Sequence, residues 1–547
     1  MQIIIPMAGS GQRFKDVGHT LPKPLIAFDD RPMIERVVNL FPGETNFTFI
    51  CNTDHLNQSK MGKILKKIAP TGKVIGIKPH KKGPVYSIAQ IFDQIDDEDE
   101  VIIHYCDVAK YWDYVDFLKH TRNRSADGAI TCTVGFHPHM TTGLCYALTK
   151  ADKQWFEELT EKKPLDDINS EYSSDGCYYF RSGSILKKYS RHLIGQDIRV
   201  NGEYYVSMLY NLMQQDGLKT SVYEVQHMLS MQVPQDLDEY HRWSNYFRLI
   251  VQPRQQIKKE KNSVNIIPLA GRGNRFTQEG YTVPKPLIEV NGEPMIIQAS
   301  ENLPPAERRI FVCLAEHLDN YPLEKKIEEV YPAAEIIRLG HVTEGQACTI
   351  EFGLQDVDPD SPVMVGACDS GALWDQKKYQ KLLNDASVDA IVWTFRHHPN
   401  AKTHPEMYGW LKINKDNFVT KMSLKVPISK DPYNDHAFTG EMYFRKAKYF
   451  SDALKQLYKK DIRFKGEFYL DSTINELVKA GLKVKVFEVE HFSSWGTPDE
   501  LKTYKYWQSF FHKCDWHDYT LYKDPSIKKT KIKKLDREYR KFKQKYK

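Results

Sequence analysis

Short runs of apolar residues alternate with helix-like segments along the chain. Apolar runs lie at 47–50, 74–77, 101–105 and 129–134, and a helix-like segment at 85–92 separates two of them. Continuous apolar runs of this length are typical of strands buried on both faces, and the helices between them supply crossover connections. The pattern predicts an α/β fold with a doubly wound, mostly parallel sheet.

The chain also contains a long internal repeat. Residues 5–14, IPMAGSGQRF, return as IPLAGRGNRF at 267–276, and PKPLI at 22–26 returns unchanged at 284–288. Further matches continue in the same order, while small insertions shift the offset from 262 to 264 positions. A repeat of this length predicts two tandem Rossmann-like domains. The expected segments are a first domain at 1–249, a linker at 250–263, a second domain at 264–512 and a basic tail at 513–547.

Composition narrows the possible partners and compartment. The net charge of +6 arises in the tail, because residues 523–547 hold twelve Lys or Arg against three Asp or Glu. The rest of the chain therefore offers no electrostatic case for a nucleic-acid partner. No apolar run approaches the roughly 20 residues that span a bilayer, and residues 1–7 are expected to form a strand, not a signal peptide. Nine scattered cysteines without a CxxC pair favour reduced thiols in the cytoplasm.

A pair of glycines follows the first apolar run of each copy. Gly9 and Gly11 in the first copy correspond to Gly271 and Gly273 in the second. Glycines at this spacing let the backbone bend tightly and let its amides approach an anion. The third glycine of a dinucleotide fingerprint and the Gly-Lys-Ser/Thr of a P-loop are both missing. By itself, the pair is equally compatible with a plain turn from strand to helix.

Two cationic residues at fixed spacing strengthen the phosphate interpretation. Arg13 and Arg275 stand two residues after the glycines, and Lys23 and Lys285 follow ten residues later, each between two prolines. A triphosphate needs fixed cations near its oxygens, which a fork-shaped Arg and a reaching Lys can supply. The flanking prolines would stiffen the backbone that presents the lysine.

Acidic residues follow a later strand in both copies. Asp107 and Asp369 each end an apolar run, where ligands gather in open α/β sheets. A helix cap is the plainer alternative, and a Mg²⁺ ligand is the functional one, since Mg²⁺ typically takes one or two carboxylates plus substrate phosphates. The second copy offers another carboxylate, Asp471, where the first copy has Ser207.

The chain resembles the sugar-phosphate nucleotidyltransferase superfamily, and more narrowly the enzymes of capsular and surface polysaccharide pathways. The motifs that carry this resemblance are G-x-G-x-R-F, Pro-Lys-Pro-Leu-Ile and the later Asp. The resemblance covers nearly all of both copies. It implies Arg275 on the leaving pyrophosphate, Lys285 near the reacting phosphates and Lys425 on the incoming sugar phosphate. It places Gly440 and Glu441 in the sugar pocket. The nucleotide-binding residues that it implies in the second copy are Ala270, Gly271, Gly273, Gly345 and Gln346.

The resemblance also implies a Mg²⁺ cofactor, held in the second copy by Asp369 and Asp471. The first copy matches the family at Gly9, Gly11, Arg13, Lys23, Gly83, Asp107 and Lys162. It departs at Ser207 and at 231–233, where Met-Gln-Val replaces the Trp-Gly-Thr at 495–497. We therefore expect the second copy to be the active one and the first copy to bind nucleotide or support the fold.

The reaction implied is transfer of a nucleoside monophosphate from an NTP to a sugar phosphate or similar small phosphate. Two other functions remain open. A GT-A glycosyltransferase would share a similar sheet, but such enzymes usually show Asp-x-Asp at the metal, whereas the residue two positions after Asp107 is Ala109 and the one after Asp369 is Gly371. A non-catalytic nucleotide-binding or regulatory protein would keep the pocket without turnover.

The basic tail has a helical pattern of its own. Its larger apolar residues from Ile532 onward are Leu535, Tyr539, Phe542 and Tyr546, which would form one narrow stripe on a basic helix. Packing of this stripe on the protein itself or on a partner subunit is one interpretation. The other is docking on an anionic membrane surface, to which basic residues would be attracted.

Overall fold

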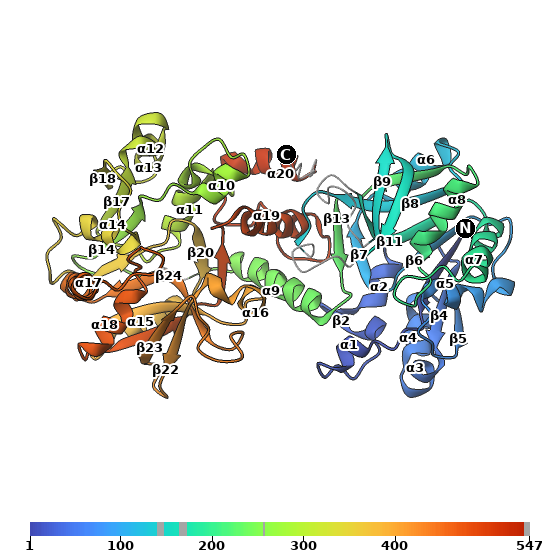
Figure 1. The fold of residues 1–547 in the computed structure, drawn as a ribbon, viewed down its shortest axis with the longest axis horizontal. Coiled ribbons are helices and arrows are strands. Elements are labelled where there is room, and N and C mark those ends of the chain that lie inside the picture. Colours follow the sequence, from blue (N-terminus) through green and yellow to red (C-terminus); the bar gives the residue numbers. More distant parts are fainter. Residues whose placement is uncertain (139–146, 163–171, 255–256, 541–547) are drawn as a thin grey trace. The chain divides into compact units, whose positions relative to one another are not determined.

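The computed structural model describes residues 1–138, 147–162, 172–254 and 257–540, and these form two compact units. Unit 1 comprises 1–243 with 513–515, and unit 2 comprises 244–512 with 516–540. The division falls inside helix α9 (Pro234–Ile250). Helices flank the strands in each unit (Figure 1).

Unit 1 contains a nine-stranded sheet in the order β5-β4-β1-β6-β11-β8-β12-β10-β9. The strands of unit 1 are β1 (Gln2–Met7), β2 (Ala27–Phe28), β3 (Arg31–Pro32), β4 (Phe47–Asn52), β5 (Lys73–Ile77), β6 (Val101–His104), β7 (Val108–Tyr111), β8 (Gly128–Val134), β9 (Ala147–Asp152), β10 (Trp155–Glu161), β11 (Tyr172–Phe180), β12 (Thr220–Glu224) and β13 (His227–Ser230). Besides α9, its helices are α1 (Gln12–Lys15), α2 (Met33–Val38), α3 (Thr53–Gln58), α4 (Met61–Ile68), α5 (Pro84–Ala89), α6 (Tyr114–Asn123), α7 (Gly183–Gly195) and α8 (Leu209–Gln215).

Unit 2 repeats this architecture, with the order β18-β17-β14-β19-β24-β21-β25 and with β22 paired to β23 and β24. The strands of unit 2 are β14 (Val264–Leu269), β15 (Glu289–Val290), β16 (Glu293–Pro294), β17 (Arg308–Leu314), β18 (Glu335–Leu339), β19 (Val363–Val365), β20 (Ser370–Leu373), β21 (Ala390–Phe395), β22 (Gly409–Ile413), β23 (Val419–Leu424), β24 (His436–Phe444), β25 (Val484–Glu488) and β26 (His491–Ser494). Its helices are α10 (Asn274–Gln278), α11 (Met295–Glu301), α12 (Ala315–Asn320), α13 (Leu323–Glu328), α14 (Gln346–Gly353), α15 (Gln376–Asn384), α16 (Asn400–Thr403), α17 (Ala447–Lys460), α18 (Ser472–Lys479), α19 (Pro498–Lys513) and α20 (Lys529–Arg540).

The predicted α/β class is confirmed, and each sheet is mixed. Strand β1 pairs in parallel with β4 and β6, and β8 pairs in parallel with β12. Between these parallel parts lies β11, which is antiparallel to both β6 and β8. In unit 2, β24 occupies the same place between β19 and β21. The strands expected at 47–50, 74–77, 101–105 and 129–134 are β4, β5, β6 and β8.

Both faces of each sheet are buried, as the continuous apolar runs predicted. Ile3 and Ile5 of β1 belong to the core on one face, and Ile4 belongs to the core on the other. In β14, Ile266 and Ile267 likewise enter different cores. Side chains alternate along a strand, so a run that is apolar at every position requires cover on both sides.

The basic tail forms helix α20, which packs its apolar stripe on unit 2. Ile532, Leu535 and Tyr539 are all buried. The Tyr539 hydroxyl donates a hydrogen bond to Gln508 Oε1 at 2.6 Å. Phe542 and Tyr546 of the expected stripe lie outside the described residues. The described part of the stripe is thus buried within the protein, as the packing interpretation predicted.

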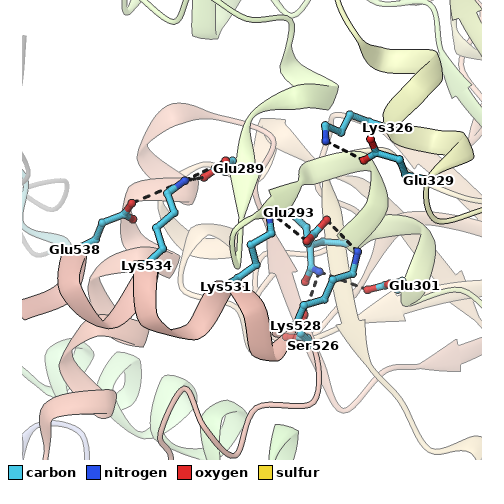
Figure 2. Close-up of polar contacts among 11 residues, drawn as sticks. Glu289, Glu293, Glu301, Lys326, Glu329, Ser526, Lys528, Lys531, Lys534 and Glu538 are labelled. Carbon is cyan, nitrogen blue, oxygen red and sulfur yellow. Dashed lines mark hydrogen bonds and ion pairs between the residues drawn. The ribbon is translucent and has the colours of Figure 1, made fainter.

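Lysines of the tail face acidic residues of the same unit. Figure 2 shows Lys534 beside Glu289, and Lys528 and Lys531 beside Glu293. The Nζ–Oε distances are 2.9 Å for Lys534 and 3.2 Å for Lys528. The Lys534–Glu289 pair is exposed, and such pairs contribute little stability each, whereas Glu293 is buried where it meets Lys528 and Lys531. Among the residues that the structure describes, no helix is both long and apolar enough to cross a membrane.

Candidate active site

The glycine loop contacts the Pro-Lys-Pro segment in both units. Gly11 and Gly273 adopt left-handed backbone conformations, with φ of 65° and 67°, just before short helices α1 and α10. A Cβ placed on Gly11 would lie 3.3 Å from the Cβ of Lys23, and one on Gly273 would lie 2.9 Å from the Cβ of Lys285. The second glycine of each pair therefore lets the loop turn directly over the lysine.

Each of these lysines pairs with the aspartate that follows β6 or β19. Lys23 Nζ lies 2.5 Å from Asp107 Oδ2 and donates a second hydrogen bond to the Gln232 carbonyl at 3.1 Å. Lys285 makes the same ion pair with Asp369. Burial lowers the pKa of Lys285, but Asp369, Cys368 and Glu500 together outweigh it, and the net shift is upward. The lysine is thus held as a cation beside a carboxylate at the carboxyl edge of the sheet.

The segment at 231–233 keeps the backbone geometry of its counterpart at 495–497. The Met231 amide donates to the Asp107 carbonyl at 2.8 Å, and the Trp495 amide donates to the Asp369 carbonyl at 2.8 Å. The change from Trp-Gly-Thr to Met-Gln-Val therefore leaves the aspartate anchored in the same way in unit 1.

Burial and Asp369 raise the pKa of two further carboxyls, Glu441 and Glu500, and neither had been predicted to lie near Asp369. Ser370 Oγ donates to Glu441 Oε1 at 2.8 Å; burial raises the pKa of Glu441 to about 7, with Asp369 adding to the effect. Burial also raises the pKa of Glu500, which accepts a hydrogen bond from the Thr497 amide at 3.0 Å. Glu441 had been expected in a sugar pocket. Glu500 had no sequence signal beyond the acidic Asp at the matching position of the first copy.

The buried carboxyl of Glu441 predicts a stability that depends on pH. The folded pKa of about 7 lies above the ordinary 4.5, so ionisation costs stability above pH 4.5 and the full cost is reached above about 7. Glu441→Gln is expected to raise the free energy of unfolding by about 3 kcal/mol near pH 8 and to change it little near about pH 4. Urea denaturation at the two pH values measures this, with Glu328→Gln on the surface as the control. A gain of equal size at both pH values would contradict a buried, ionisable Glu441.

Asp471 lies in a second cluster with Lys425. Its carboxyl is buried, Oδ1 has no hydrogen-bond partner among the described residues, and burial raises its pKa to about 6 while Lys425 opposes the shift. Burial lowers the pKa of Lys425, Asp471 raises it and Arg275 lowers it further. Lys425 also donates to the Met407 carbonyl. Arg275, Lys425 and Asp471 are thus brought together, whereas Asp369 belongs to the cluster of Lys285.

Lys162 repeats the conformation of Lys425 in unit 1. Both have a left-handed backbone, with φ of 56° and 59°, directly after strands β10 and β23. Lys162 Nζ donates to the Tyr205 hydroxyl, which in turn donates to Glu203. Non-glycine residues rarely adopt this conformation, and such residues gather at functional sites.

A cavity of about 460 Å³ opens at the carboxyl edge of the sheet in unit 1. This volume lies within the range of small-molecule sites. It brings together every residue that the family resemblance assigned to the first copy. The predicted residues that line it are Gly9, Gly11, Arg13, Lys23, Gly83, Asp107 and Lys162. Glu161, Tyr205 and Glu203 line the same cavity and were not predicted from the sequence.

Gly83 and Gly345 are required by close backbone packing at the start of helices α5 and α14. Their φ angles are 84° and 134°. A Cβ on Gly83 would lie 2.7 Å from the Tyr204 amide nitrogen, and one on Gly345 would lie 2.4 Å from the Phe468 carbonyl oxygen. Gln346 is the half-buried first residue of α14. These positions join the helix start to the segment that leads into Ser207 or Asp471.

The remaining predicted residues lie at the ends or within strands of unit 2. Ala270 is buried directly after β14, and Gly271 next to it is exposed. Gly440 lies in β24 with φ of 109°, and a Cβ there would be 3.2 Å from the Cβ of Ala367. Gly440 therefore lets β24 pass close to the segment that leads to Asp369.

A family model for nucleotidyl transferases matches residues 2–199, within unit 1. The match therefore covers about the first third of the chain and does not reach unit 2. Two solved structures are similar to the chain. The nucleoside-diphosphate-sugar pyrophosphorylase of Vibrio cholerae RC9 is 21% identical over 44% of this chain and 98% of that chain, with a TM-score of 0.36. The inositol-1-phosphate CTP transferase of T. maritima is 18% identical over 45% and 94%, with a TM-score of 0.35. No curated protein sequence matches the chain.

Proposed function

We propose that this chain transfers a nucleoside monophosphate from an NTP to a sugar phosphate or a similar small phosphate and releases pyrophosphate. The observation that carries the proposal is the cavity of unit 1, where a glycine loop, one arginine, two lysines and an aspartate line a single space. The match of residues 2–199 to the family model for nucleotidyl transferases supports the same reaction class. By the resemblance of both copies, we place the activity in the cytoplasm, as a supply of activated sugars for a surface polysaccharide.

The proposed chemistry is an in-line displacement. An oxygen of the acceptor phosphate forms a bond to the α-phosphorus with its lone pair, and the bond from that phosphorus to the β-bridging oxygen breaks, so pyrophosphate leaves with the electron pair. Positioning and charge neutralisation supply most of the rate enhancement in such reactions. In unit 2, Arg275 would stabilise the leaving pyrophosphate, Lys285 the reacting phosphates and Lys425 the acceptor phosphate.

Mg²⁺ is the proposed cofactor, and the chemistry of the acidic residues fits it. Asp107 lines the cavity of unit 1, and Asp369 holds the matching place in unit 2. Across 1–138, 147–162, 172–254 and 257–540, no group of three or more His, Cys, Asp or Glu side chains is arranged to hold a metal. A site with only one or two carboxylates suits Mg²⁺, because this ion completes its shell with substrate phosphates and water. When bound, the ion would neutralise charge on the phosphates.

Pyrophosphate release tests the proposal directly. The full chain is mixed with Mg²⁺, each of ATP, CTP, GTP, UTP and dTTP, and a panel of sugar 1-phosphates and alcohol phosphates. Pyrophosphate formed only when NTP and one acceptor are both present is the expected result, and the double variant Lys23→Ala/Lys285→Ala should abolish it. Sugar transfer from a nucleotide sugar without pyrophosphate would favour a glycosyltransferase. Nucleotide binding without any turnover would favour a regulatory protein.

A further inference from the structure

The position of Ser207 in unit 1 matches that of Asp471 in unit 2. Each stands four residues after the glutamate of a Gly-Glu pair, Glu203 or Glu467, and each of these glutamates pairs with the residue three positions before it in an isolated β-bridge. Both Ser207 and Asp471 are buried at the start of a helical segment. The fold therefore presents the same place in both units, once with a hydroxyl and once with a carboxylate.

A carboxylate from a different strand reaches this place in unit 1. Ser207 Oγ donates a hydrogen bond of 2.5 Å to Glu161 Oε2. Glu161 is the last residue of β10 and directly precedes Lys162, and it lines the cavity. The matching residue of unit 2 is Leu424, which ends β23 and directly precedes Lys425. One unit thus supplies the carboxylate from the strand, and the other supplies it from the start of the helix.

A third position changes together with these two. A Cβ placed on Gly409, the first residue of β22, would lie 2.7 Å from Asp471 Oδ2. The glycine leaves room at this position for the Asp471 carboxylate and for Met422 Cε, which would lie 2.1 Å from such a Cβ. Unit 1 has Ala147 at the matching first position of β9, and Ala147 lines the cavity together with Glu161. Because no aspartate stands at position 207, this methyl group is accommodated.

The two carboxylates also share their electrostatic surroundings. Burial raises the pKa of Glu161, and Lys162 opposes the shift. The same two influences, burial and the lysine that follows the strand, act on Asp471. Both carboxylates therefore stand next to a lysine with a left-handed backbone.

We propose that Glu161 is the second carboxylate of unit 1 and that unit 1 is a complete transfer centre. This inference rests on the proposed function and departs from the expectation that unit 1 is degenerate, which was drawn from Ser207 and from the change at 231–233. Glu161 would act with Asp107 toward the bound metal and phosphates, as Asp471 would act with Asp369 in unit 2. Each unit would carry out the same displacement, with one NTP and one acceptor phosphate consumed and one pyrophosphate released.

The test uses the full chain with unit 2 silenced by Lys285→Ala and Asp369→Asn. In this background we expect pyrophosphate release to persist and Glu161→Gln to lower it at least about tenfold, a modest share of the effect of one lost electrostatic contact. Glu161→Gln should also weaken Mn²⁺ binding in the presence of the NTP, measured by electron paramagnetic resonance. Glu158→Gln, an exposed residue of the same strand, is the matched control and should change neither readout.

A rescue experiment distinguishes loss of the Glu161 carboxylate from damage to the fold. The triple variant Ala147→Gly/Glu161→Leu/Ser207→Asp copies the arrangement of unit 2 and is expected to recover turnover and Mn²⁺ binding lost in Glu161→Gln. Circular dichroism and thermal unfolding check that each variant is folded. Failure of the triple variant to recover either readout while folded would count against the exchange.

Two outcomes overturn the inference and leave the proposed function standing. In the first, the chain silenced in unit 1 by Lys23→Ala releases pyrophosphate, and the chain silenced in unit 2 releases no pyrophosphate. The other is Glu161→Gln with unchanged turnover and unchanged Mn²⁺ binding. If the unmodified chain releases no pyrophosphate from any pair of substrates, the proposed function fails instead. The Mn²⁺ measurement with each NTP then still decides whether Glu161 belongs to a metal–nucleotide site.

Discussion

Lys285→Ala is expected to lower turnover at unit 2 by at least about a hundredfold, the usual size of a lost electrostatic contact to a reacting group. Lys285 is held as a cation beside Asp369 and under the glycine loop, so its loss removes positive charge at the proposed phosphate position. Steady-state pyrophosphate release measures the effect in a Lys23→Ala background, in which unit 1 is silent. Asp369→Asn should give a loss of similar size.

The control for this change is another lysine of unit 2. Lys326 is paired with Glu329 on the surface of α13, as Figure 2 shows. Lys326→Ala removes the same charge from the same unit and should leave turnover within about twofold of its parent, because exposed ion pairs contribute little. Near-normal turnover of folded Lys285→Ala would remove this lysine from the proposed reaction.

Gly345→Ala is expected to be among the most destabilising single substitutions in unit 2. The added Cβ would lie 2.4 Å from the carbonyl oxygen and 2.6 Å from the amide nitrogen of Phe468, and backbone atoms cannot move aside as a flexible side chain can. Overpacking of this kind costs about 1–3 kcal/mol, and the positive φ of 134° adds backbone strain. Nucleotide affinity should fall as well, because the loop that precedes Asp471 would shift.

Gly466→Ala separates the two causes. Gly466 also has a positive φ, 84°, but no atom lies within 4 Å of the position of its Cβ. We expect Gly345→Ala to lose about 2 kcal/mol more than Gly466→Ala in urea denaturation. Equal losses in the two variants would show that φ alone matters and that the close approach to Phe468 has no energetic weight.

Glu161 shows where inference from the sequence reached its limit. Comparison of the two copies reveals that Ser207 stands opposite Asp471, and this difference, with the change at 231–233, suggested a degenerate first copy. The hydrogen bond that joins Glu161 to Ser207 spans 46 positions and depends on how β10 packs beside the start of the helical segment. Local spacing contains no information on that packing, so the sequence could not show that Glu161 takes the place of the missing aspartate.

The tail gives a second example of the same limit. Its 3.6-residue periodicity predicts a helix with a stripe at Ile532, Leu535 and Tyr539, and α20 has these residues buried. A hydrophobic stripe indicates that one face of the helix must be buried, but it does not indicate which surface buries it. The structure shows that these three residues are covered by unit 2 itself, which the periodicity could not show.

The sequence by itself determined the α/β class, the repeat and the presence of a glycine loop and Pro-Lys-Pro in both copies, because strand burial and turn chemistry are local properties of residue type. The tertiary structure alone decided that β11 and β24 run antiparallel, since an apolar run is the same read in either direction. It also decided which carboxylates meet. Glu441 and Glu500 are close enough for Asp369 to raise their pKa, while Asp471 lies near Lys425, because long-range packing brings charges together from strands and helices far apart in the chain.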